Sequence, residues 1–206
     1  MSNNFKLTLT VLSLLLLTIS SYSQNALGIY GSANYGNLIE NSDIDFFDFD
    51  FSSSFGIIYM KNINDKVDLV YQMGYEKMGS ISKNHSDLNP TIDLYWKRNS
   101  INLFFGANYD FLMSEKFKLG LLLLPKLSYV YNQQYRIVED QSIGITEFYC
   151  KKNVLLGVNT KLNLAFSISS LVDIQVRPGF SFTSYFDNNE YINRIWSIDF
   201  VIVKKL

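Results

Sequence analysis

Residues 171–182 read LVDIQVRPGFSF, and this stretch decides the fold. Apolar and polar residues alternate along it, with Val172, Ile174 and Val176 set against Asp173, Gln175 and Arg177, and with Phe180 and Phe182 set against Gly179 and Ser181. A period of two predicts a β-strand with one apolar and one polar face. In a soluble barrel the apolar face packs in the core, whereas in an outer-membrane barrel it meets lipid and the polar face meets the lumen. The remaining sequence decides between these two barrels.

The composition fits one domain and excludes several classes of protein. The 206 residues carry 18 basic and 19 acidic side chains, so no basic excess indicates a nucleic-acid partner. Aromatic residues are abundant, with 16 Phe, 14 Tyr and 2 Trp. Cys150 is the only cysteine and His85 the only histidine, which excludes an intramolecular disulfide and a zinc set of these ligands. We expect no metal and no cofactor.

The N-terminus has the pattern of a cleaved secretory signal over residues 1–23. Lys6 supplies the positive charge, residues 7–19 form the apolar segment, and Ser21-Tyr22-Ser23 resembles a cleavage site. This segment of 13 residues is shorter than the roughly 18 to 20 that a spanning helix needs. No later apolar run reaches that length, so residues 24–206 cross a membrane as strands or do not cross it.

Eight segments alternate with a period of two, and long and short connections alternate strictly between them. The segments are residues 27–35, 51–61, 67–78, 92–111, 117–131, 148–166, 171–182 and 192–203. This pattern predicts an all-β fold, an eight-stranded antiparallel up-and-down transmembrane barrel with periplasmic termini and four long extracellular loops. Tyrosines fall at both ends of the apolar rows, as in two aromatic girdles: Tyr35, Tyr75 and Tyr129 at the outer end, and Tyr59 and Tyr109 at the inner end.

Two features disturb the pattern. Leu122 and Leu124 stand where polar residues are expected in the fifth segment. Pro125 and Pro178 lie inside predicted strands, although proline has no N–H to donate and a closed barrel has no free edge. We therefore expect a β-bulge beside each proline.

The signal sequence, the eight-strand plan, the turn at Asn64-Asp65-Lys66-Val67-Asp68-Leu69 and the strand at 171–182 resemble the PorT-like small outer-membrane β-barrels of the Bacteroidetes lineage. They resemble the OmpX and OmpA barrels more distantly. The resemblance covers essentially residues 25–206 and includes no catalytic motif. It implies the cell envelope of a Gram-negative bacterium and, through the PorT-like relatives, an association with protein secretion.

The polar faces of the predicted strands would meet inside the barrel. An eight-stranded barrel is just wide enough to be filled by side chains, so we expect a closed lumen rather than a pore. Buried charges need partners, which predicts a structural plug of ion pairs and hydrogen bonds. A narrow proton or small-ligand site is the functional alternative. The predicted lumen network consists of Asp68, Gln72, Glu76, Asp110, Lys126, Lys151, Asp173, Gln175, Arg177 and Asp199.

An acidic stretch, ENSDIDFFDFD at 40–50, is the other candidate site. Its acids are Glu40, Asp43, Asp45, Asp48 and Asp50. Carboxylates are calcium ligands, but the spacing lacks the glycine and bidentate glutamate of a calcium loop. A solvated loop or bulged strand extension is the main interpretation, and a cation or surface-partner site is the alternative.

The sequence offers little for catalysis. His85-Ser86-Asp87 are adjacent residues, and a catalytic triad needs groups oriented from separate backbone positions. Cys150 has lipid-facing parity and is interpreted as a small apolar filler.

We therefore expect a non-enzymatic integral outer-membrane barrel, structural or adhesive, or accessory to an envelope or secretion complex. Its expected partners are outer-membrane lipid and envelope proteins. The alternative is a soluble periplasmic lipocalin-like barrel that binds an apolar ligand, and a lipid-modifying outer-membrane enzyme is third. Polarity separates the first two, because a lipocalin-like barrel has an apolar interior and a polar exterior.

Overall fold

The computed structural model describes residues 25–40, 50–82, 92–139, 145–149, 153–185 and 191–206. These residues form nine β-strands, and no helix among them is long and apolar enough to cross a membrane. The strands are β1 (Ala26–Glu40), β2 (Asp50–Asn64), β3 (Val67–Ser82), β4 (Ile92–Met113), β5 (Phe117–Glu139), β6 (Ile145–Tyr149), β7 (Asn153–Ser167), β8 (Val172–Tyr185) and β9 (Tyr191–Lys205). The interpretations of residues 1–23 as a signal sequence, of His85-Ser86-Asp87 and of Cys150 lie outside the described residues.

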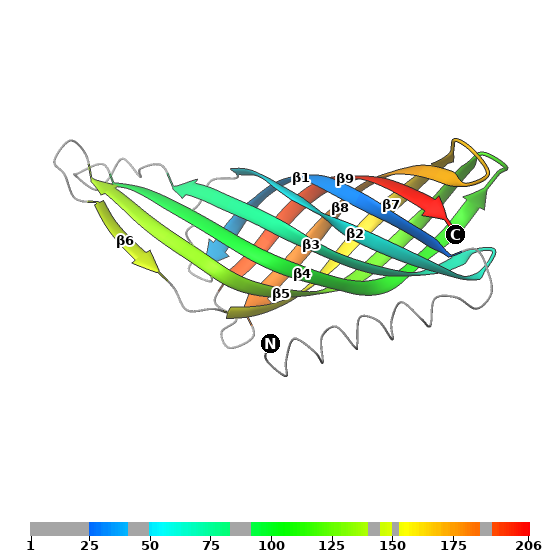
Figure 1. The fold of residues 1–206 in the computed structure, drawn as a ribbon. Helices are drawn as coiled ribbons and strands as arrows, with labels where there is room; N and C mark the ends of the chain where they lie inside the picture. The colour runs from blue at the N-terminus through cyan, green and yellow to red at the C-terminus, as the bar shows by residue number, and fades with distance from the viewer. Residues whose placement is uncertain (1–24, 41–49, 83–91, 140–144, 150–152, 186–190) are drawn as a thin grey trace, which may run out of the picture.

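The strands form one closed antiparallel barrel (Figure 1). Strands β1 to β5 and strands β7 to β9 pair in chain order, and β9 pairs with β1 to close the barrel. β6 and β7 both pair with β5 in the same register, β6 from Ile145 opposite Val138 and β7 as far as Phe166 opposite Phe117. β6 and β7 therefore lie end to end beside β5, where the sequence predicted the single segment 148–166. Counted together as one strand, they make the barrel eight-stranded, as expected from the alternating connections.

The short connections lie at one end of the barrel, together with the C-terminus. Each is closed by a side chain that accepts backbone hydrogen bonds, as in Asx and Ser/Thr turns. Asn64 Oδ1 accepts from the N–H groups of Lys66 and Val67 at 3.0 Å, and Ser169 Oγ accepts from that of Val172 at 3.1 Å. At the same end, Leu206 N–H donates to the Asn25 carbonyl at 2.7 Å. We call this end the short-turn end.

At the opposite end the strands run further than the sequence predicted. β3 and β4 stay paired as far as Ser82 opposite Leu94, and β5 reaches Glu139, opposite Ile92. The predictions that 79–91 and 132–147 are wholly loops were therefore wrong. Polar residues continue these ladders because β4 hydrogen-bonds to β3 on one side and to β5 on the other beyond the rim of the barrel, where the long green strands extend in Figure 1.

The bulges expected beside the two prolines are absent, so that prediction was also wrong. Pro125 lies opposite Val158 of β7, and Pro178 lies opposite Ile198 of β9, with no shift of register in either ladder. Each proline also has a second neighbouring strand, which is β4 for Pro125 and β7 for Pro178. In that ladder two residue pairs are missing, and the pairing then resumes in the same register. This local gap accommodates the missing N–H without an extra residue.

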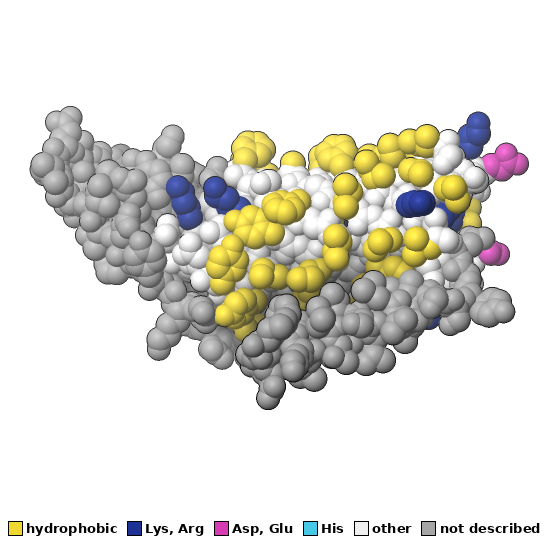
Figure 2. Space-filling view, in the orientation of Figure 1, with side chains coloured by type: hydrophobic (Ala, Val, Ile, Leu, Met, Phe, Trp, Pro, Cys, Tyr) yellow, Lys and Arg dark blue, Asp and Glu magenta, His cyan; other side chains and the backbone are white. Residues whose placement is uncertain are grey.

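The barrel is apolar outside and mostly polar inside. On β9, Phe200 exposes 59% of its surface while the adjacent Asp199 exposes 1%. Leucine, isoleucine, phenylalanine and tyrosine side chains form most of the outer surface, and Figure 2 shows them in yellow over the visible strands. A soluble lipocalin-like barrel requires the opposite polarity, because its exterior meets water. The lipid-facing interpretation of Val172, Ile174 and their alternating neighbours therefore fits this surface.

The interior also contains an apolar cluster that the sequence pattern did not assign. Leu122 and Leu124, which blurred the period of β5, are fully buried inside the barrel. The cluster contains Ala26, Tyr30, Ile58, Met60, Val70, Phe104, Leu122, Leu124, Val201 and Val203. Glycine makes room for its largest members: a Cβ on Gly74 of β3 would collide with the Tyr30 hydroxyl that reaches over from β1. Apolar packing therefore fills the lumen together with polar groups.

Candidate functional site in the barrel interior

The structure places nine of the ten predicted lumen residues on the inward faces of the strands. Asp68 is half-buried near the short-turn end, and the other eight are buried. These eight are Gln72, Glu76, Asp110, Lys126, Asp173, Gln175, Arg177 and Asp199. Lys151 lies outside the described residues.

One ion pair joins β3 to β5, the two strands on either side of β4. Lys126 Nζ lies 2.8 Å from Glu76 Oε2, and both side chains are almost wholly buried. Asn102 Nδ2 of β4 donates to the same oxygen at 2.9 Å. The ammonium group also lies 5.6 Å from the centre of the Phe104 ring, within the range of a cation–π contact. Glu76 is therefore held by a charge and an amide from two other strands.

A second buried ion pair joins β7 to β9. Lys161 Nζ lies 2.6 Å from Asp199 Oδ1. Asp199 was predicted to face the lumen, but Lys161 was missed. Its signal was present in the sequence, because Lys161 is two residues from Asn159 and shares its inward parity. The same rule of parity finds Arg98, which is buried two residues before the inward Ser100.

Arg177 is fully buried and is held mainly by amide oxygens. Its Nε donates to Asn163 Oδ1 at 3.1 Å and to Gln175 Oε1 at 3.0 Å, and its Nη2 donates to Gln175 Oε1. Met60 Sδ, from the opposite side of the lumen, lies 3.5 Å from Nη2. Asp199 is its register partner on β9 but bonds to Lys161 instead. The guanidinium thus ties β7, β8 and β2 together.

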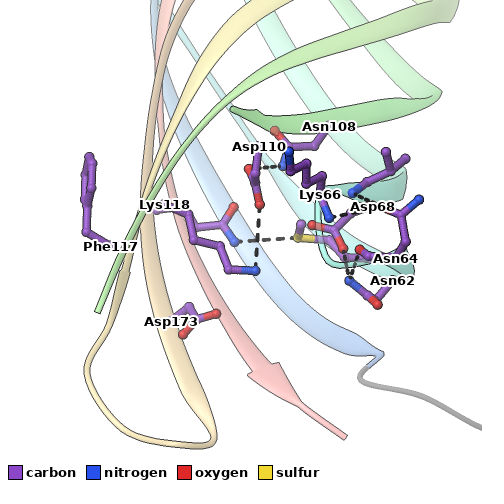
Figure 3. Close-up of polar contacts among 12 residues, drawn as sticks. Asn62, Asn64, Lys66, Asp68, Asn108, Asp110, Phe117, Lys118 and Asp173 are labelled. Carbon is purple, nitrogen blue, oxygen red and sulfur yellow. Dashed lines mark hydrogen bonds and ion pairs between the residues drawn. The ribbon is translucent and has the colours of Figure 1, made fainter. Parts of the chain in front are cut away.

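A third set of polar side chains lies in the barrel mouth at the short-turn end (Figure 3). Asn62 Nδ2 donates to Asp68 Oδ1 at 3.0 Å, and Asn108 Nδ2 donates to Asp110 Oδ1 at 2.7 Å. Lys118 Nζ lies 3.7 Å from Asp110 Oδ2 and is partly exposed. In Figure 3 these side chains project into the barrel mouth, whereas Phe117 points away from it.

The mouth also holds Asp173, whose Oδ1 forms an ion pair with Lys205 Nζ at 3.0 Å. Asp173 and Lys205, with Asp68, Asp110 and Lys118, line a cavity of about 50 Å³. A second cavity of about 20 Å³ lies deeper, between the two buried ion pairs. Both are far smaller than the roughly 300 Å³ or more of a small-molecule pocket. The interior is therefore packed, with room for water-sized ligands.

The acidic stretch is not placed as a site. Glu40 ends β1 and Asp50 begins β2, and Asp43, Asp45 and Asp48 lie outside the described residues. In the described part of the chain, no three His, Cys, Asp or Glu side chains are grouped so that they could hold a metal ion.

Comparisons with known proteins bear on the fold. No protein-family model matches the chain, and no curated protein matches it. Among solved structures, a major outer membrane protein from Thermus thermophilus aligns with a TM-score of 0.52 at 7% identity, covering 87% of this chain and 99% of that one. The Yersinia pestis attachment invasion locus protein Ail, in complex with the heparin analogue sucrose octasulfate, aligns with a TM-score of 0.47 at 12% identity, covering 89% and 100%. Neisserial surface protein A aligns with a TM-score of 0.43 at 16% identity, covering 88% and 99%. The likeness to the Thermus protein shows a shared fold, that of an outer-membrane β-barrel.

Proposed function

We propose that this chain is a non-enzymatic integral protein of a Gram-negative outer membrane, with its short-turn end in the periplasm. The observation that carries the proposal is the polarity of the barrel, with an apolar belt outside and paired charges inside. Such a surface is stable in lipid and would aggregate in water. The Thermus likeness supports the same location.

The filled lumen argues against transport and catalysis as the main task. The two buried lysines pair with carboxylates, Lys126 with Glu76 and Lys161 with Asp199, and the cavity between the two pairs is only about 20 Å³. This arrangement stabilises a barrel and leaves recognition to the outer end. We place the chain with the PorT-like barrels on its sequence pattern, which makes it an accessory of an envelope or secretion complex.

A strand edge at the outer end offers a way to bind a partner protein. Among the described strands, β6 pairs with β5 alone, and an extended segment of a partner protein could pair with its other edge. Photo-crosslinking from position 146 in β6 tests this role, with position 115 in a short turn as the control. Crosslinks to an envelope protein from position 146 alone support it, and their absence removes the accessory role.

Location and orientation can be tested together. We expect the protein in the outer-membrane fraction, resistant to carbonate extraction and migrating faster in unheated SDS gels. Recovery in the soluble periplasm would overturn the proposal. In a Cys150→Ser background, Lys97→Cys should react with a membrane-impermeant maleimide on intact cells. Glu115→Cys, in a short turn, should react only after permeabilisation, and the reverse pattern would contradict the orientation.

A further inference from the structure

Six polar atoms without a hydrogen-bond partner in the protein belong to buried side chains that line the deeper cavity of about 20 Å³. Gln72 Oε1 is on β3, and the other five are Asn34 Nδ2, Asn159 Oδ1, Ser181 Oγ, Ser197 Oγ and Asp199 Oδ2. A buried polar group that lacks a hydrogen bond destabilises a protein by about 1 to 3 kcal/mol. Six around one cavity therefore indicate a ligand that bonds to several of them.

Five of the six atoms come from one continuous wall of four neighbouring strands, β7, β8, β9 and β1. Asn159 of β7 lies opposite Ser181 of β8, and Ser197 of β9 lies opposite Asn34 of β1. Ser181 and Ser197 lie on the adjoining strands β8 and β9, one inward position apart in the ladder, because Ser197 pairs with Gly179. The backbone ladders therefore hold the five atoms in a defined arrangement.

The charges around the cavity decide the class of ligand. Glu76 with Lys126 and Asp199 with Lys161 line the same cavity, and each pair is closed at 2.8 Å or less. The two carboxylates and two ammonium groups cancel, so a cation or an anion would enter without a compensating charge. The cavity of about 20 Å³ has a size that suits water, since a cavity needs on the order of 10 to 15 Å³ to hold one molecule.

We propose that this cavity is a binding site for one or two ordered water molecules inside the barrel. Asn34 Nδ2 donates a hydrogen bond to the water, which in turn donates to Asn159 Oδ1 and Asp199 Oδ2. The two serine hydroxyls donate or accept as the water requires. The water connects the Lys161–Asp199 pair to β1, β7 and β8, and the lumen closes around a neutral ligand instead of an ion.

Crystallography of the full chain tests both the site and the class of ligand. A structure at about 1.5 Å resolution should show a water-sized peak within hydrogen-bond distance of Asp199 Oδ2 and Ser197 Oγ. Crystals soaked in thallium(I) and in bromide should show no anomalous peak there. Absence of the water peak overturns the site, and an anomalous peak in either soak overturns the neutral class.

A variant that fills the cavity provides a second test in solution. In lipid nanodiscs, the side-chain amide of Asn34 should show a nuclear Overhauser contact to water. Ser197→Val replaces the hydroxyl with apolar volume and should abolish this contact, while Ser53→Val on the exposed outer face should retain it. A contact that persists in Ser197→Val, or is missing in the unmodified protein, overturns the proposal. The crystallographic test needs no variant and decides the question if Ser197→Val fails to fold.

Discussion

Replacing Lys126 with methionine should destabilise the barrel strongly, because it leaves a carboxylate buried without its ion-pair partner. Lys126 Nζ lies 2.8 Å from Glu76 Oε2, and after the substitution Asn102 still donates to that oxygen, at 2.9 Å. Methionine matches the length of the lysine stem, so packing changes little. Removing one partner of a buried ion pair costs about 3 to 5 kcal/mol, and we expect a loss of unfolding free energy of that size.

The assay is urea unfolding of the detergent-folded or lipid-folded protein, followed by tryptophan fluorescence. Trp196 lies on the outer surface with 58% exposure, so its emission reports transfer from lipid to water. The double variant Glu76→Gln with Lys126→Met removes both charges, and its amide can still bond to Asn102. It should recover at least half of the lost free energy. Lys77→Met, an exposed lysine on the same strand as Glu76, is the matched control and should change stability by less than about 0.5 kcal/mol.

Two results would refute this reasoning. If Lys126→Met unfolds within about 0.5 kcal/mol of the unmodified protein, the ion pair does not hold Glu76 in the folded barrel. If the double variant is as unstable as the single one, the loss comes from packing of the lysine stem against Phe104 and not from an uncompensated charge.

Three further substitutions probe other parts of the interior. Arg177→Ala removes a fully buried guanidinium and should lower the heating temperature at which the folded band is lost in SDS gels, whereas an unchanged temperature would rule out its structural role. Gly74→Ala should cost about 1 to 3 kcal/mol in urea unfolding, since the new methyl group meets the Tyr30 hydroxyl, and adding Tyr30→Phe should restore part of it. Leu122→Ala should cost about 2 to 5 kcal/mol by leaving a cavity inside, against about 1 kcal/mol for the lipid-facing Leu121→Ala, and equal losses would contradict the assigned faces.

Parity along the strands made most of the interior predictable. Asp173, Gln175 and Arg177 alternate with apolar residues, and the barrel turns all three inward. The same rule, applied two residues beyond Asn159, would have found Lys161. Parity does not identify which charges meet, because partners such as Lys161 and Asp199 are 38 residues apart and are brought together by the closure of the barrel.

The sequence by itself determined that the barrel has eight strands and that consecutive strands are antiparallel. It also determined the lipid-facing side of LVDIQVRPGFSF, since a period of two places each side chain on one face or the other. Only the tertiary structure decided how Pro178 is accommodated, because a gap or a bulge depends on the register of β7 and β9 on either side. It also decided that Leu124 faces inward, since β5 keeps one register through its leucine-rich part. Alternation is a local property of the chain, whereas the contents of a closed lumen depend on all the strands that surround it.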